Sequence, residues 1–203
     1  MNREIAVIGD IHGNIEALDG ILAAIEGQWT DLVFLGDYIN RGRKSAQVLQ
    51  RLIELSANSK SVHCLAGNHE EEFLNLLETG NIMRFLRIGG AGTINSYLET
   101  PEGDLIERLR RAVPGTHLEF LRNLPKFYVS KGLIVTHKPP RHILEPNTYY
   151  VHGHVPQASL YPEFGKYSAA IDTGCGTLTG GRLTCLLWPS LRVMQVNSSG
   201  ALL

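Results

Sequence analysis

Seven polar residues in this sequence are of types that bind divalent metal ions or move protons, and each follows a short apolar run. They are Asp10 and His12, then Asp37, then Asn68 and His69, and later His137 and His154. Carboxylate, amide and imidazole groups are hard or borderline ligands, and no cysteine stands among these residues. Such a set suits Mn, Fe, Zn and similar divalent ions better than a soft metal.

More ligands are present than one metal ion needs, so the residues indicate two ions that share a bridging carboxylate. Two ions about 3.5–4 Å apart are a common arrangement for displacement at phosphorus, because they stabilise both the attacking and the leaving oxygen. Two divalent ions with two carboxylates leave a formal charge of about +2, which attracts a phosphate dianion. The expected nucleophile is a metal-bound water molecule whose pKa is lowered toward ~7.

Apolar runs alternate with helical patterns in the first eighty residues, and this alternation explains how the polar residues meet. Strands are expected at 4–8, 31–35 and 61–65, and helices at 14–26, 45–55 and 70–77. The repetition predicts parallel strands with right-handed crossovers, so all three strands end at one edge of a sheet. Asp10, Asp37 and Asn68 are separated by 27 and 31 residues, one crossover each, and are expected to converge at that edge.

The rest of the chain changes character twice. Residues 82–124 are mostly helical by pattern and are interrupted by the glycine-rich stretch at 89–92. From residue 127 onward, short apolar runs between Gly and Pro predict a second, more antiparallel sheet. Its strands are expected at 127–129, 133–136, 148–151, 169–171, 183–187 and 192–196. With no linker or repeat in view, we expect a single domain over residues 1–203, with a mostly helical insertion at about 82–124.

The composition fits a folded domain and excludes several classes of protein. The chain has 203 residues, of which 43% are hydrophobic and 19% charged, and its formal net charge is −1. This balance argues against binding nucleic acid or an anionic membrane through bulk electrostatics. No apolar run approaches the ~18 residues of a membrane span. The N-terminus shows no secretory signal, and three unclustered cysteines fit reduced thiols, which together predict a cytoplasmic location.

Several motifs, in order along the chain, resemble those of the calcineurin-like metallophosphoesterases. The first three are GDIHG at 9–13, GDYINRG at 36–42 and GNHE at 67–70, in the form found in the serine/threonine protein phosphatase branch. The later matches are Thr136-His137, Gly153-His154, and IDTG at 171–174 followed by GGRLT at 180–184. The similarity extends from residue 9 to about residue 184, nearly the whole chain.

The resemblance implies an α/β fold, a four-layer α-β-β-α sandwich of two mixed sheets, and a role for each matching residue. It assigns the first metal ion to Asp10, His12 and the bridging Asp37. It assigns the second ion to Asp37, Asn68, His137 and His154. Arg41 and Asn68 would contact the phosphate, and His69 would be the general acid that protonates the leaving oxygen. The implied cofactors are two divalent ions, Mn first, with Fe, Zn, Ni and Co as alternatives.

Two positions depart from the family pattern. The second signature usually has Asp before its Arg-Gly, where this chain has Asn40, and that Asp normally pairs with the histidine acid. Asn40 cannot stabilise an imidazolium by charge, so we expect a less basic His69 and slow turnover of poor leaving groups. Lys138 follows His137 where the family favours a small-residue turn, and it either reaches substrate or is solvated. Arg141 is the candidate for the family's second phosphate-binding arginine.

These residues predict a phosphomonoesterase, most directly a serine/threonine protein phosphatase acting on a phosphorylated protein or a small phosphate ester. The dinucleoside tetraphosphatase branch is the first alternative, because it also lacks the Asp of the second signature and its leaving groups need less protonation. A non-catalytic phosphoprotein-binding module is the second alternative. We expect neither a nucleic-acid nor a membrane partner, and the oligomeric state stays open.

Other polar residues have more ordinary explanations. The acidic run at 70–72 fits the start of a helix, where the helix dipole favours negative charge. His152 shares a strand face with His154, so it is either a metal ligand or a residue that holds one. Asp172 either acts near the metals or forms a turn of the Asp-Thr-Gly type. The glycines at 89–92 predict a helix break near the mouth of the site.

Overall fold

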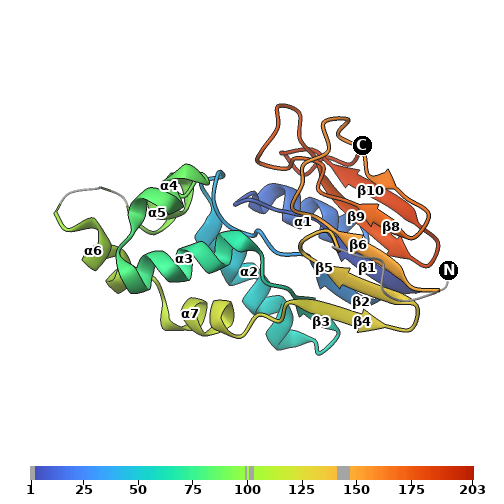
Figure 1. The fold of residues 1–203 in the computed structure, drawn as a ribbon, viewed down its shortest axis with the longest axis horizontal. Coiled ribbons are helices and arrows are strands. Elements are labelled where there is room, and N and C mark those ends of the chain that lie inside the picture. Colours follow the sequence, from blue (N-terminus) through green and yellow to red (C-terminus); the bar gives the residue numbers. More distant parts are fainter. Residues whose placement is uncertain (1–2, 99, 101–102, 141–146) are drawn as a thin grey trace.

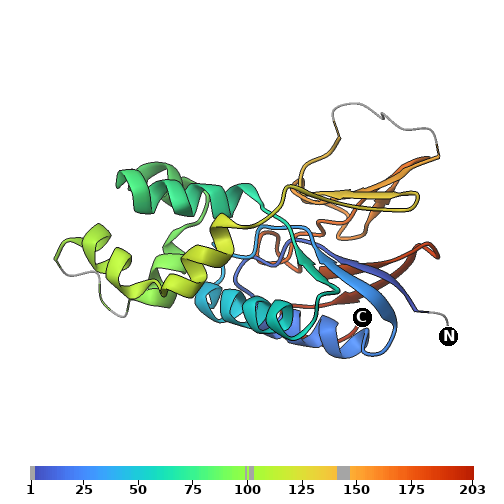
Figure 2. The ribbon, with the colours of Figure 1, turned by 90° about the horizontal axis from the view of Figure 1, so that it is seen from below.

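The computed structural model describes residues 3–98, 100, 103–140 and 147–203, which form two β-sheets packed face to face beside a lobe of helices (Figures 1 and 2). The first sheet has the strand order β10-β9-β1-β2-β3. Its strands are β1 (Glu4–Ile8), β2 (Trp29–Phe34), β3 (Val62–Cys64), β9 (Leu183–Trp188) and β10 (Arg192–Val196). β1, β2 and β3 are parallel, as their alternation with helices predicts, and β9 pairs antiparallel with β1.

The second sheet has the strand order β4-β5-β6-β8-β7. Its strands are β4 (Phe127–Ser130), β5 (Leu133–Thr136), β6 (Tyr149–His152), β7 (Glu163–Phe164) and β8 (Ser168–Ala170). β5, β6 and β8 are parallel, while β4 and β7 are antiparallel edge strands. The expectation of an α/β fold with two mixed sheets and flanking helices is therefore confirmed.

The sequence-based description of the sheets is wrong in two respects. The second sheet was expected to be more antiparallel, but two of its four strand pairs are parallel, as in the first sheet. The runs at 183–187 and 192–196 were expected in the second sheet, but they form β9 and β10 of the first. Five of the six residues of β9 are buried, because this strand lies between β1 and β10 and is covered on both faces. An apolar run shows that a strand is buried but does not identify its neighbours. The short strand β7 was not predicted.

The alternation of side chains along β1 explains why the sheets and helices form layers. Ala6 and Ile8 point to the helix-covered face, where they pack with Leu18 of α1 (Ile15–Ala24) and Leu52 of α2 (Ser45–Asn58). Val7 points to the opposite face and joins the core between the two sheets. Figure 2 shows α1 and α2 on the outer face of the first sheet and, in the part of the chain that is described, no helix over the outer face of the second.

A lobe of helices follows β3 and lies at the end of the molecule where β1, β2 and β3 finish (Figure 1). Its helices are α3 (Asn68–Thr79), α4 (Ile82–Arg87), α5 (Ala91–Tyr97), α6 (Leu105–Ala112) and α7 (Gly115–Arg122). Phe73 of α3 stacks on Phe85 of α4 and on Tyr97 of α5, which ties the lobe together. None of the described helices combines the length and the apolar character that crossing a membrane requires.

Candidate metal centre

The two loops that follow β1 and β2 are bonded to each other through their backbones. The N–H groups of Ile11 and His12 both donate to the carbonyl of Asp37, at 3.1 and 2.9 Å, and the N–H of Gly42 donates to the carbonyl of His12 at 3.0 Å. The site contains five non-glycine residues with positive φ: His12, Asp37, Asn40, Arg41 and His154. Such conformations carry strain and persist only where the surrounding structure fixes them, which is common at functional sites.

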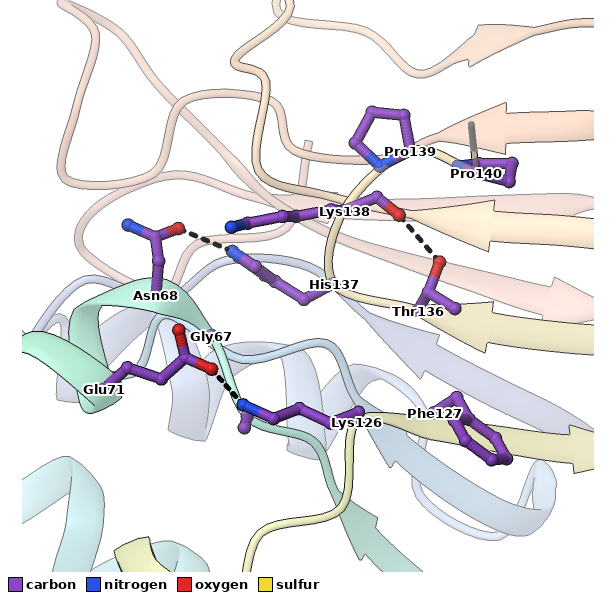
Figure 3. Close-up of a pocket in the computed structure, with 11 residues that line it drawn as sticks. Gly67, Asn68, Glu71, Lys126, Phe127, Thr136, His137, Lys138, Pro139 and Pro140 are labelled. Carbon is purple, nitrogen blue, oxygen red and sulfur yellow. Dashed lines mark hydrogen bonds and ion pairs between the residues drawn. The ribbon is translucent and has the colours of Figure 1, made fainter. Parts of the chain in front are cut away.

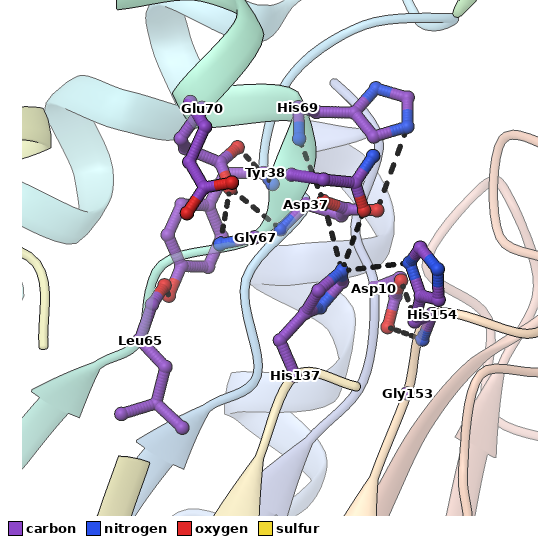
Figure 4. Close-up of polar contacts among 12 residues, drawn as sticks. Asp10, Asp37, Tyr38, Leu65, Gly67, His69, Glu70, His137, Gly153 and His154 are labelled. Carbon is purple, nitrogen blue, oxygen red and sulfur yellow. Dashed lines mark hydrogen bonds and ion pairs between the residues drawn. The ribbon is translucent and has the colours of Figure 1, made fainter. Parts of the chain in front are cut away.

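Four side chains place their ligand atoms around one point; Figure 4 shows Asp37, His137 and His154, and Figure 3 shows Asn68 against His137. His137 Nε2 lies 3.0 Å from Asn68 Oδ1, 3.3 Å from Asp37 Oδ1 and 3.2 Å from His154 Nδ1. Atoms bound to one metal at ~2.0–2.2 Å lie about 3.0–3.5 Å from one another, so these spacings suit a shared ion. We call Asp37, Asn68, His137 and His154 the second cluster, since the family resemblance assigned the same four residues to the second metal.

The other oxygen of Asp37 faces a different group of side chains. Asp37 Oδ2 lies 3.6 Å from His69 Nε2 and 4.0 Å from His12 Nε2, and these three residues form the first cluster. A hydrogen bond of 3.1 Å between His12 Nδ1 and the carbonyl of Ile39 leaves Nε2 of that ring directed into the site. Asp37 thus presents one oxygen to each cluster, which is the geometry of a bridging carboxylate.

Asp10 lies beside these clusters and is almost completely buried. Its carboxylate accepts a hydrogen bond from the backbone N–H of His154, at 3.2 Å to Oδ2. Burial, with repulsion from the carboxylates of Asp172 and Asp37, raises the pKa of Asp10 well above its ordinary value. A Cβ atom at Gly153 would collide with the Asp10 carboxylate, so the Gly-His motif keeps this carboxylate in place.

The charges in the site fit a bound cation. Burial also raises the pKa of Asp37, with the Glu70 carboxylate adding repulsion. Burial lowers the pKa of His137 to about 3, helped by the neighbouring His154 and His69, so the imidazole is in its neutral, ligand form. Buried carboxylates without a counter-charge are costly. A divalent cation would relieve this repulsion and use the free electron pairs of the imidazoles, so the residues present fit the metal ions that the sequence predicts.

A fully buried network determines how Asn40 meets His69. Asn40 Nδ2 lies 2.8 Å from His69 Nδ1, and Asn40 Oδ1 accepts a 2.7 Å hydrogen bond from Thr93 Oγ1. Thr93 Oγ1 also accepts the backbone N–H of Asn40 at 2.8 Å and lies 3.0 Å from Ser45 Oγ. Because the amide oxygen is engaged by Thr93, the amide NH₂ donates to His69 Nδ1. The proton of the neutral His69 ring then sits on Nε2, facing Asp37.

Glu70 is a functional residue that the sequence analysis missed, because the acidic run at 70–72 was assigned to a charged helix start. Glu71 and Glu72 do pair with cations, Lys126 and Arg84. Glu70, however, is only 1% exposed, and its carboxylate accepts the backbone N–H groups of Asp37, Tyr38 and Gly67, each at 2.9 Å. It joins the loops that carry Asp37 and Asn68. The sequence signal for this role was the position of Glu70 three residues after Gly67, from which its carboxylate reaches back to the Gly67 N–H at the start of α3.

The remaining predicted site residues fall in different places. Arg41 is exposed, with its backbone N–H bonded to the carbonyl of Gly89, so the glycine stretch does lie beside the site. Lys138 is exposed, and Arg141 falls outside the described residues. His152 belongs to neither cluster and contacts the carbonyl of Gly153 at 3.4 Å. Both alternatives for Asp172 have support, since it accepts the N–H of Gly174 in a turn at 3.0 Å and its charge also helps to raise the pKa of Asp10.

Comparisons with known proteins agree with this geometry. The profile of the family described as calcineurin-like phosphoesterase matches residues 3–170. The asymmetrical bis(5'-nucleosyl)-tetraphosphatase PrpE of Bacillus cereus strain 03BB102 is 23% identical over 244 residues, an alignment that covers 95% of this chain and 94% of that protein.

Solved structures are similar over nearly the whole chain. One assigned as a diadenosine tetraphosphatase superimposes with a TM-score of 0.69 at 18% identity, covering 97% of this chain and 94% of the other. A cold-active protein-tyrosine phosphatase of a psychrophilic Shewanella species gives a TM-score of 0.58 at 14% identity, covering 100% and 80%. At these identities the superpositions establish the fold.

Proposed function

The chain belongs to the calcineurin-like phosphoesterase family, and we propose that it is a dinuclear metal-dependent phosphohydrolase that releases good leaving groups, of which nucleotide polyphosphates are the leading class. Asp10, His12 and Asp37 would hold the first ion, and the second cluster would hold the other. When bound, the ions would draw in the phosphate and activate a water molecule for in-line attack on phosphorus. Mn is the first choice, with Fe, Zn, Ni and Co as alternatives.

The observation that carries this substrate class is the donation from Asn40 to His69. A neutral ring with its proton on Nε2 can donate a hydrogen bond to the leaving oxygen. It cannot gain a second proton on Nδ1 without opposing the NH₂ group of Asn40, whose orientation Thr93 fixes. A phosphate leaving group is stable as an anion and needs only that hydrogen bond, whereas a serine or threonine alkoxide needs a full proton. The tetraphosphatase named among the relatives supports the same class.

Arg41 is the residue proposed to bind the phosphate oxygens. It is exposed, it follows Asn40 directly, and its backbone is held by Gly89. A guanidinium can hold two oxygens of a phosphate at once, which fixes the orientation of the reacting group. Because this arginine is accessible from solvent, a phosphate on a protein could also reach it. Phosphoserine or phosphothreonine on a protein is therefore the second candidate substrate.

The experiment is a substrate panel with each of the five metals. Diadenosine tetraphosphate, a phosphoserine peptide and p-nitrophenyl phosphate are compared by kcat/KM, with Asp37→Asn as the control that removes the bridging carboxylate. We expect the dinucleotide to exceed the phosphopeptide and Asp37→Asn to abolish all three activities. A higher kcat/KM for the phosphopeptide would reverse the order of the candidates. Bound metal with no turnover of any substrate would instead support a binding module.

The cysteines support the proposal that the protein is located in the cytoplasm. Cys64, Cys175 and Cys185 are buried free thiols, and burial raises the pKa of each to about 12. Thiols with this environment are unreactive and persist in a reducing compartment such as the cytoplasm.

A further inference from the structure

Two cavities of different character flank the metal-ligand clusters. One, of about 420 Å³, is bounded by Asn68 and His137 and continues to Phe127 and Lys138 (Figure 3). The other, of about 270 Å³, is bounded by His12 and Arg41. Because each cavity shares a wall with proposed metal ligands, a group attached to a phosphorus atom at the centre can extend into either one.

The cavity beside Asn68, which we call the Phe127 cavity, is mainly apolar, and two lysines stand among the described residues that line it. The Phe127 side chain is 61% exposed, and Pro139 and Pro140 contribute further apolar surface. The charge of Lys126 is matched by an ion pair with Glu71. Lys138 forms no ion pair with any described carboxylate.

Lys138 is placed to act at the metal centre. Figure 3 shows its side chain directed toward Asn68, and the hydroxyl of Thr136 fixes the turn by donating to the Lys138 carbonyl at 2.8 Å. Its positive charge is also among the causes, after burial, that lower the pKa of both His137 and His154. An unmatched ammonium at this position attracts a phosphate oxygen.

The cavity beside His12, which we call the Arg43 cavity, is cationic, and no Phe, Tyr or Trp stands among the described residues that line it. Arg41 and Arg43 are exposed, and neither forms an ion pair with a carboxylate of the described residues, while Lys44 is paired with Glu16. Guanidinium groups suit a chain of phosphates. The apolar cavity therefore suits the base of a nucleoside polyphosphate, and the cationic cavity suits its chain of phosphates.

We propose that the Phe127 cavity binds the nucleoside attached to the reacting phosphate, with Lys138 on that phosphate, and that the Arg43 cavity binds the rest of the polyphosphate chain. This assignment rests on the proposed function. A nucleobase gains by stacking on an exposed aromatic ring, and the cavity volume lies within the ~300–1,000 Å³ typical of small-molecule sites.

The assignment also fixes the products. Water adds to the phosphorus next to the nucleoside, and the bond from that phosphorus to the bridging oxygen breaks. The bridging oxygen leaves with the electron pair on the polyphosphate, and one proton of the water is released. The nucleoside monophosphate is then left in the Phe127 cavity, and the polyphosphate product leaves from the Arg43 side. His69 belongs to the cluster on that side, with its ring 4.7 Å from that of His12, so its Nε2–H, which lies beside Asp37, would be the donor to the leaving oxygen when substrate binds.

The test measures binding of adenosine 5'-monophosphate and ribose 5-phosphate by calorimetry, since only the first carries a base. Phe127→Ala should weaken the binding of adenosine 5'-monophosphate roughly 10-fold and leave the affinity for ribose 5-phosphate unchanged. Lys138→Ala should weaken both ligands roughly 10-fold, because both carry the phosphate. Phe164→Ala and Lys131→Ala are the matched controls, since they remove an exposed aromatic ring and an exposed ammonium far along the second sheet, and should leave both affinities unchanged.

Several results would overturn the assignment. One is a wild-type protein that binds the two ligands equally, and another is a Phe127→Ala variant that loses affinity for both. A third is a Phe127→Ala variant that loses kcat/KM for the phosphoserine peptide instead of the nucleotide, because the cavity would then be a peptide site. A protein that hydrolyses no substrate would contradict the proposed function, while the calorimetry would still decide what the cavity binds.

Discussion

Replacing Asn40 by Asp tests the reasoning that connects this structure to its substrate class. The Asp carboxylate would keep the hydrogen bond from Thr93 on one oxygen and would face His69 Nδ1, 2.8 Å away in the present geometry, with the other. Nδ1 would then carry a proton, because a carboxylate can only accept. The variant therefore converts a neutral hydrogen-bond donor at His69 into a potential imidazolium acid, without removing any partner from the buried network.

The structure sets the expected size of the effect. Burial, together with the nearby positive charge of Arg41, lowers the pKa of His69 to about 4, so about one ring in a thousand is protonated at pH 7. An opposite charge in contact raises the pKa of an imidazole by about 1–3 units. The protonated fraction, and with it the kcat for alkyl phosphates, should rise about 10- to 500-fold at pH 7, which does not exceed the ~10²–10⁴ that general acids supply. Aryl phosphates, whose leaving group needs little protonation, should gain less than about 3-fold.

The assay compares kcat for phosphoserine peptide and for p-nitrophenyl phosphate across pH 5–9 in both proteins. In the variant, the limb on which alkyl-phosphate activity falls with rising pH should move to higher pH, since the protonated ring is the active form. The double variant Asn40→Asp with His69→Asn is the control and should show no gain. Equal gains on both substrates, or a gain that survives the loss of His69, would refute the role given to Asn40.

Three further predictions concern stability. Glu70→Gln places an NH₂ group against backbone N–H groups that now donate to the Glu70 carboxylate. Urea unfolding should therefore show a loss of about 1–3 kcal/mol in the free energy of unfolding. An unchanged midpoint would contradict the role of Glu70 in holding the loops together. Mn²⁺ at 100 times its dissociation constant should stabilise the protein by about 2.7 kcal/mol, or roughly 5–10 °C in Tm; Asp37→Asn should abolish this shift, and a shift that persisted in that variant would place the metal elsewhere. Burial lowers the pKa of His117, which contacts Tyr97 and Gln50, so folding favours its neutral form and stability should fall as the pH drops below about 6.5. His117→Gln should reduce that pH dependence in urea titrations between pH 5 and 8, and an unchanged slope would show that His117 does not contribute.

Local sequence determined the parallel half of the first sheet and the identity of the converging residues. Each strand of that half is a short apolar run followed at once by a polar loop and a helix, and the loop residues must lie at the carboxyl edge whatever the rest of the chain does. This is why Asp37 and Asn68 could be placed together from their spacing alone. His137 and His154 of the second cluster were expected from the family resemblance instead.

Contacts between distant segments decided what the sequence left open. β9 lies between β1 and β10 in the first sheet and is buried on both faces. Its apolar sequence predicts burial but does not identify the strands that it pairs with. Glu70 lies beneath two loops because three backbone N–H groups require an acceptor there. The direction of the Asn40 amide depends on Thr93, 53 residues further along the chain. Residue type sets which hydrogen bonds a side chain can form, but only the packing of α5 against the loop of the second signature selects the one that Asn40 gives to His69.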